Sequence, residues 1–221
     1  MKKNYISNST ESTRMFKSGV LENLSKVHFS VPLYIYVPVI IFCTYKAFDN
    51  GIGILPYLGY YIAGLAVWTI TEYLLHRYIF HYYPSSKWGQ RLHFIFHGVH
   101  HDYPSDSMRL VMVPSISIPL AALFYFLFYK LLGHVYVFPF FAGFLTGYLF
   151  YDMTHYAVHH FNLKSKFWME LKHHHMLHHY QDAHNGYGVS SKFWDLIFKT
   201  TFRKEKKTNV THNSPEQVVQ N

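Results

Sequence analysis

Residues 51–71 read GIGILPYLGYYIAGLAVWTIT, 21 positions without one Lys, Arg, Asp or Glu. A helix that crosses the hydrocarbon core of a bilayer needs about 20 predominantly apolar residues, and this stretch has that length. Three other runs have the same character. The alternative is a soluble all-α protein in which these runs form buried helices. The sequence favours an all-α integral membrane protein with four transmembrane helices, at about 28–48, 51–75, 110–129 and 131–151.

The composition of the 221 residues narrows the class of protein further. Half of them are apolar and 14% are charged, which argues against a disordered chain, and the length allows one domain with a tail. The mean hydropathy of −0.02 is low because histidines and tyrosines offset the apolar runs. The single cysteine, Cys43, excludes an intrachain disulfide and any metal site built from cysteines.

The distribution of charge predicts the topology. The breaks at 46–50 and Lys130 are short enough to be hairpin turns, so both face one side of the membrane. The other side receives 18 of the 20 Lys and Arg residues, the asymmetry of a cytoplasmic face. We therefore expect a cytoplasmic segment at 1–27, a membrane domain at 28–202 and a polar, disordered tail at 203–221. Because the basic residues flank the spans, they favour anionic lipid headgroups over nucleic acid as a partner.

Fifteen of the 18 histidines fall on the predicted cytoplasmic side, where we expect a histidine-rich helical cap. His28, His134 and His212 are the exceptions. Positions i, i+3 and i+4 share one face of a helix. Three groups have this spacing: His97 with His100 and His101, His155 with His159, and His175 with His178 and His179.

His76 and His81 are spaced differently. They lie five residues apart, which corresponds to about 140° around an α-helix. On this basis we expect that they cannot comfortably bind one ion together. They would serve two different ions or bracket the end of a helix.

Histidines in this number and spacing point to metal binding. Neutral imidazole is the commonest protein metal ligand and suits Zn, Cu, Fe and Ni. Ten candidate ligands exceed one coordination sphere, so two neighbouring ions are the economical interpretation. Glu72, Asp102 and Asp152 each lie within four residues of a candidate ligand and could accept the second N–H of its ring. For Glu72, a carboxylate that reaches out to the membrane edge is an equal alternative.

The location of the site bears on the choice of metal. Zinc would polarise water for hydrolysis, whereas iron would activate dioxygen. At a membrane surface the abundant substrates are lipids, and acyl chains offer inert C–H bonds that oxidation attacks and hydrolysis does not. A zinc-dependent lipid hydrolase is one rival. A divalent-metal transporter is another, but it should place ionisable groups in the middle of its spans, and here the spans nearly lack them.

Four stretches carry a resemblance to a known family. They are HRYIFH at 76–81, FHGVHHDYPSDSMRLVMVP at 96–114, YDMTHYAVHH at 151–160 and HMLHHYQDAHNGYGVSSKFWD at 175–195. They resemble the fatty acid hydroxylase superfamily, and within it the sphingolipid (ceramide) fatty acid 2-hydroxylases. The resemblance runs from about Glu72 to Phe198. It implies a membrane dinuclear-metal monooxygenase that hydroxylates C2 of the acyl chain of ceramides or free fatty acids, using O2 and two electrons.

The resemblance also implies the ligands. No catalytic residue is expected beyond the metal centre, which would hold two Fe ions, with Zn able to occupy the site in a purified protein. His174 is a rival to His175, because it lies four residues before His178, and otherwise it is expected to support the ligands from outside the metal centre. The family's ligands correspond to His76, His81, His97, His100, His101, His155, His159, His175, His178 and His179.

The family pattern carries expectations about partners and location. The 27 residues before the first span are too few for the fused cytochrome b5 domain of many members, so we expect a separate electron carrier, cytochrome b5-like or ferredoxin-like. For the same reason a bacterial inner membrane is favoured over the endoplasmic reticulum. Hydroxylation of a sterol or carotenoid, or desaturation, remains an alternative that would use the same histidines.

Two further features could contact the substrate. The glycine-containing segment from Gly186 to Trp194 could close over the site and exclude water, or be a simple turn into an amphipathic helix. Arg109 and Tyr103 could hold a lipid headgroup, or anchor the chain at the membrane interface.

Overall fold

A computed structural model describes residues 6–202, and the ordered elements within that range are all helical. The tail predicted at 203–221 lies outside the described residues. The π-helices are named η, and the elements follow in chain order. They are α1 (Gly19–Leu24), α2 (Val31–Asp49), α3 (Ile54–Leu74), η1 (Leu75–Phe80), α4 (Lys87–His93), η2 (Phe94–Gly98), α5 (Val99–Asp102), α6 (Pro114–His160), α7 (Lys166–Tyr180) and α8 (Phe193–Ile197).

Three of the described helices are long and apolar enough to cross a membrane. They are Val31–Asp49, Ile54–Phe80, in which α3 continues through η1, and Pro114–His160. The helical class predicted from the apolar runs is confirmed. The third and fourth predicted spans are joined within α6.

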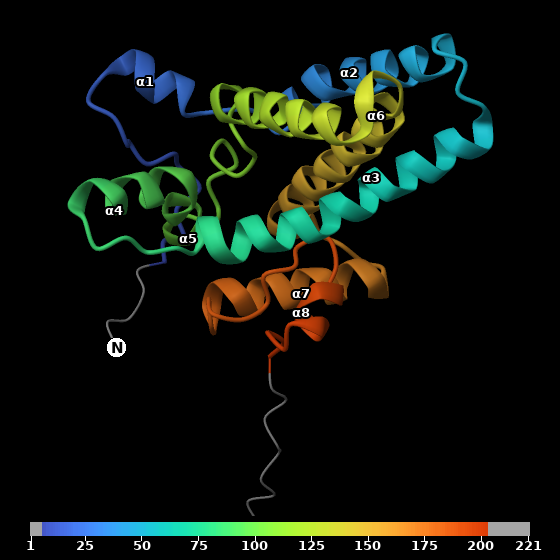
Figure 1. The fold of residues 1–221 in the computed structure, drawn as a ribbon. Coiled ribbons are helices and arrows are strands. Elements are labelled where there is room, and N and C mark those ends of the chain that lie inside the picture. Colours follow the sequence, from blue (N-terminus) through green and yellow to red (C-terminus); the bar gives the residue numbers. More distant parts are fainter. Residues whose placement is uncertain (1–5, 203–221) are drawn as a thin grey trace, which may run out of the picture.

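Helix α6 bends sharply at Gly133, where the backbone is non-helical with φ of 74° and ψ of 175°. We call residues 114–132 the first arm and 134–160 the second arm, and Figure 1 shows the second arm turning back from the first. A positive φ is readily adopted only by glycine. This explains why the bend falls at Gly133 rather than at the predicted Lys130.

The ends of α6 also differ from the predicted spans. The helix begins at Pro114 and not at residue 110, because proline fits the first turn of a helix and holds the residue before it extended. Leu110 and Val111 instead pack against Val27 in a small core. At its other end the second arm continues past 151 to His160, and so carries His155 and His159 out of the apolar run.

Helix α3 and the second arm of α6 pack in close contact through glycines. A Cβ atom built on Gly64 would lie 1.9 Å from the Phe140 carbonyl oxygen, and one on Gly143 would lie 1.9 Å from the Tyr61 carbonyl oxygen. Small residues let membrane helices approach to this degree. The close approach fixes the ends of both helices relative to each other, and the histidines lie at those ends.

The short helices gather at this end of the long ones. Figure 1 shows α4 and α5 beside the end of α3, with α7 and α8 below it. Trp194 of α8 donates its indole N–H to the Thr69 hydroxyl of α3, at 3.1 Å. Segments far apart in sequence are thereby brought around one site.

Candidate metal centre

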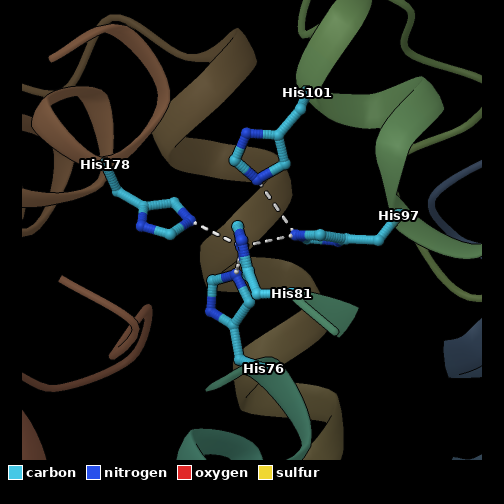
Figure 2. A group of neighbouring side chains, drawn as sticks. All are labelled: His76, His81, His97, His101 and His178. Atoms are coloured by element: carbon cyan, nitrogen blue, oxygen red, sulfur yellow. Dashed lines mark hydrogen bonds between the residues drawn. The ribbon is translucent and has the colours of Figure 1, made fainter. Parts of the chain in front are cut away.

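Five histidines meet in what we call cluster A, which comprises His76, His81, His97, His101 and His178. The Nε2 atom of His81 lies 3.2 Å from that of His76, 3.1 Å from that of His97 and 2.9 Å from that of His178 (Figure 2). One ring nitrogen carries either one proton or one lone pair, so it cannot form three hydrogen bonds to other ring nitrogens. Convergent lone pairs are the arrangement that a cation requires.

The other five predicted ligands form cluster B, which comprises His100, His155, His159, His175 and His179. Here the Nε2 atom of His175 lies 2.9 Å from that of His159 and 3.1 Å from that of His179. Neither ring nitrogen of His100 or His155 has a hydrogen-bond partner among the described residues, although both side chains are buried. Buried polar atoms without partners are rare and require an explanation, which a bound ion would supply.

Helical spacing distributes the histidines between the clusters. Pairs four residues apart share a cluster: His97 with His101 in A, and His155 with His159 and His175 with His179 in B. His100 lies between His97 and His101 in sequence but belongs to cluster B. His178 lies between His175 and His179 but belongs to cluster A. The same short helices therefore contribute to both clusters, and the two centres adjoin.

The expectation that His76 and His81 serve different ions is wrong, since both belong to cluster A. The alternative, that they lie at the end of a helix, agrees with the structure, in which His81 follows the last helical residue, Phe80. The chain forms a π-helix at 75–80, and the His81 N–H donates to the His76 carbonyl at 3.1 Å. This is an i to i+5 hydrogen bond, and the wider turn brings residues five apart onto one face. A second π-helix, η2, carries His97. Single π-helical turns are often found at functional sites.

The histidines outside the long helices are held neutral. Burial, followed by the charges of neighbouring histidines, lowers the pKa of His100 to about 3. Burial lowers the pKa of His178 to about 4, although its bond to the Asn185 carbonyl acts in the opposite direction. The same cause lowers the pKa values of the other ligands in this region, namely His81, His97, His101, His175 and His179. Neutral imidazole is the form that binds metal.

The donor set fits transition-metal ions. All ten donors are imidazole nitrogens, and Cys43 is buried in the apolar core of α2 and α6, so it offers no thiolate to either cluster. Imidazole ligands suit Fe, Zn, Cu and Ni, whereas Mg and Ca prefer oxygen.

The predicted carboxylate partners do not contact the rings. Glu72 accepts hydrogen bonds from the backbone N–H groups of Val189 and Ser190, both at 2.9 Å, rather than from His76. Asp152 lies beside Tyr148 and Met112. His155, three residues further on, has no partner in the described part of the chain. Asp102 has no side-chain bond to an imidazole within residues 6–202. The expectation that these three carboxylates accept the second N–H of a ligand ring is therefore wrong.

Backbone carbonyls take the place of those carboxylates. The Nδ1–H of His76 donates to the Tyr187 carbonyl, and that of His178 donates to the Asn185 carbonyl at 2.7 Å. A backbone acceptor leaves no mark in the sequence, so only the fold could find these contacts. His174 lies outside both clusters and bonds through Nε2 to Asp195 Oδ2 at 3.1 Å, which removes it as a rival to His175.

The segment from Gly186 to Trp194 was expected either to close over the site or to form a simple turn into a helix, and its contacts agree with a turn. Residues 186–190 are buried, and the backbone N–H groups of 187–190 donate to Asp195 and Glu72, while that of Gly186 donates to the Thr200 carbonyl. Gly186 has φ of 73°, and a Cβ on Gly188 would lie 2.0 Å from the Ser191 carbonyl oxygen. The glycines are therefore required by a packed turn rather than by a hinge.

An apolar cavity of about 580 Å³ opens beside the clusters. His97 of cluster A and His100 and His155 of cluster B form part of its wall. Most of the remaining wall is apolar and comes from several parts of the chain. Examples are Leu75 and Ile79, Leu92 and Ile95, Val111 and Val113, and Ile116 and Leu120. Its volume is in the range of small-molecule binding sites.

Arg109 does not project toward a headgroup. Its guanidinium is buried and donates to Glu22 Oε1 at 2.5 Å, to the Ser25 hydroxyl at 2.7 Å and to the Thr13 carbonyl at 2.7 Å. The expectation of headgroup binding by Arg109 is therefore wrong. Arg109 fixes the N-terminal segment against the rest of the protein, and Met15 of that segment lines the cavity.

Comparison with known proteins now defines the class. The family model for fatty acid hydroxylases matches residues 61–200, and the chain belongs to this family. It is an integral membrane protein of a metal-dependent hydroxylase family, with histidine clusters suited to metal ions.

Individual relatives can be named. The chain is 37% identical over 183 residues to the ceramide very long chain fatty acid hydroxylase scs7 of Schizosaccharomyces pombe, covering 81% of this chain and 52% of the relative. It is 33% identical to the dihydroceramide fatty acyl 2-hydroxylase FAH1 of Arabidopsis thaliana, covering 86% of this chain and 80% of the relative. The chain thus spans about half the length of the yeast relative.

A solved structure agrees with the fold. Full-length scs7p, of which only the hydroxylase domain is visible, superimposes with a TM-score of 0.79 at 38% identity, covering 83% of this chain and 70% of that chain. The relatives named here are eukaryotic, so they give no support to a bacterial inner membrane.

Proposed function

We propose that the protein is a membrane-bound dinuclear-metal monooxygenase that hydroxylates C2 of the fatty acyl chain of a sphingolipid, ceramide or free fatty acid. The observation that carries the proposal is the apposition of two five-histidine clusters to an apolar cavity. The named activities of the yeast and plant relatives support the choice of an acyl chain and of C2. They do not favour a sterol, a carotenoid or a desaturation.

The ten histidines of clusters A and B are the proposed metal ligands, one ion to each cluster. We assign iron as the native metal, and when bound it would supply the activation of O2 that attack on a C–H bond requires. Zinc competes for such sites because Zn²⁺ generally binds nitrogen ligands more tightly than Fe²⁺ does.

The protein's own part in the reaction is to bind and orient the chain. The apolar wall of the cavity accepts an acyl chain without leaving its methylene groups in water. His97, His100 and His155 line the cavity, so a carbon of the bound chain can come to rest beside both clusters. The apolar surroundings also exclude bulk water from the reacting carbon.

The proposed topology has four membrane crossings: α2, α3 and the two arms of α6. The polar hairpins at 46–50 and near Lys130 would lie on one side, and the short helices with both clusters would form a cap on the other. The excess of Lys and Arg around this cap supports a cytoplasmic position for it.

Each turnover of the proposed reaction consumes two electrons. We propose that a separate one-electron carrier, cytochrome b5-like or ferredoxin-like, supplies them.

Lipid mass spectrometry after heterologous expression with an electron donor tests the function. Under air, cells should accumulate sphingolipids or fatty acids with a hydroxyl next to the acyl carbonyl, and under argon they should not. The His178→Ala variant is the control for background activity. Products hydroxylated or unsaturated elsewhere, or 2-hydroxylation equal to that of the variant, would contradict the proposal.

A further inference from the structure

One loop, residues 185–190, reaches the outer side of cluster A. The carbonyls of Asn185 and Tyr187 accept the Nδ1–H groups of His178 and His76, whose side chains are 0% and 1% exposed. With the proton held on Nδ1, the lone pair of each ring is on Nε2, the atom that points into the cluster (Figure 2). The loop therefore sets both the tautomer and the direction of two ligands.

Two buried carboxylates hold this loop. Four consecutive backbone N–H groups donate to them: those of Tyr187 and Gly188 to Asp195, at 2.9 and 2.8 Å, and those of Val189 and Ser190 to Glu72, both at 2.9 Å. The carboxylates come from different elements, Glu72 from α3 and Asp195 from α8. Asp195 is 0% exposed and also accepts from the Thr200 hydroxyl at 2.7 Å.

In cluster B such support is confined, among the described residues, to His159, which bonds to the Pro104 carbonyl. The Nδ1 atoms of His155, His175 and His179 have no hydrogen-bond partner among residues 6–202, and for His100 this holds for both ring nitrogens. These rings are placed by helix packing alone. Hydrogen bonds on the outer side of metal-binding histidines raise ligand basicity and fix ring orientation, and their loss typically costs about 10- to 100-fold in metal affinity.

We propose that Glu72 and Asp195 are positioning residues that set the metal affinity of cluster A and not that of cluster B. The two clusters consequently bind metal unequally, with cluster A the tighter site. This inference rests on the proposed function to the extent that both clusters bind metal.

Zinc binding to the purified full chain in detergent provides the test. Titration against a competing chelator should resolve two sites of different affinity in the unaltered protein. In Asp195→Asn and in Glu72→Gln the tighter site should weaken by about 10- to 100-fold while the weaker site keeps its affinity. The matched control is Asp106→Asn, which removes a buried carboxylate that accepts from Ser12 and pairs with Arg109, away from the loop. It should leave both affinities unchanged.

Ligand-deficient backgrounds assign the effect to a cluster. His175→Ala disables cluster B, and the site that remains should weaken when Asp195→Asn is added. His178→Ala disables cluster A, and the site that remains should be unaffected by Asp195→Asn. The far-ultraviolet circular dichroism spectrum and the elution volume identify variants that fold. If Asp195→Asn does not fold, Glu72→Gln is added to the same two backgrounds instead. It should weaken zinc binding in His175→Ala and leave it unchanged in His178→Ala.

The outcomes separate the two proposals. If the unaltered chain binds two zinc ions and the carboxylate variants weaken neither, or weaken the site that survives in His178→Ala, the positioning role is overturned and the metal centre stands. If the unaltered chain binds no zinc, the dinuclear centre itself fails, and the positioning role with it.

Discussion

Adjacent side chains in this protein have separate roles at the scale of the residue. His174 contacts a buried carboxylate, His175 enters cluster B and His173 is exposed to solvent. The spacing of histidines singled out eight of the ten members of the clusters, because residues three or four apart share one face of a helix. His76 and His81 lack that spacing, and the family resemblance supplied them. Spacing was not enough to find Asp195 or the two carbonyls, since their contacts depend on a loop conformation that carries no periodic signal.

The pair His178→Ala and His173→Ala compares two histidines of one helix. His178 is buried in cluster A, so its removal should lower the metal content and abolish the 2-hydroxylated product. His173 is exposed, and its replacement should leave both near the level of the unaltered protein. Elemental analysis and lipid mass spectrometry give the two readouts. Normal turnover by His178→Ala would refute its assignment as a ligand.

Acid should destabilise the metal-free protein in a defined range. The pKa values of His100 and His178 are lowered to about 3 and about 4 in the folded state, against about 6.5 in the unfolded chain. At a pH between the folded-state and unfolded-state pKa values, these histidines bind more protons in the unfolded chain than in the folded protein. The free energy of unfolding therefore falls as the pH falls below about 6.5. Thermal melts of chelator-treated protein should show a nearly constant Tm above pH 7 and a decline toward pH 5. A Tm that rises on acidification would contradict the buried, neutral state of these rings.

At the scale of elements, hydropathy predicted where the long helices lie but not how they bend or widen. The bend at Gly133 depends on one positive φ, and the π-helix η1 depends on a hydrogen-bond register that does not alter the apolar pattern. For that reason His76 and His81 were assigned to different ions or to a helix end, although the wider turn places them together. The contact of α3 with the second arm of α6 likewise depends on glycines that a hydropathy profile does not distinguish.

Gly143→Ala tests that contact. The added methyl would overlap the Tyr61 carbonyl oxygen, and overpacking of this kind typically costs about 1–3 kcal/mol. The variant should have a lower Tm and a lower metal content, because the helix ends that carry the clusters would shift. Gly59→Ala is the matched control, since a Cβ there meets nothing within 4 Å. An unchanged Tm in Gly143→Ala would show that the two helices do not pack as described.

At the scale of the whole molecule, the cavity is formed by parts of the chain that are distant in sequence, from Met15 to His155. No single stretch predicts it, because each contributes only a few apolar side chains. The N-terminal segment was expected to be cytoplasmic, and its attachment to the cavity wall through buried hydrogen bonds of Arg109 was not predicted from the sequence. The four-crossing topology follows from the apolar runs and the charge bias, and it stays a prediction.

Single cysteines placed at Asp49 and His173, in a chain with Cys43 replaced by serine, test the topology. In sealed vesicles of one orientation a membrane-impermeant maleimide should label only one of the two positions, because the hairpin and the cap lie on opposite sides. Both labels should appear after detergent is added. Equal labelling in sealed vesicles would contradict the four crossings.

The central claim is that ten imidazoles bind two neighbouring metal ions beside an acyl-chain cavity. The most direct measurement is anomalous X-ray diffraction from crystals of the full chain, recorded on both sides of the absorption edge of the metal found by elemental analysis. The account predicts two peaks, one within cluster A and one within cluster B. A single peak, or peaks outside both clusters, would contradict it.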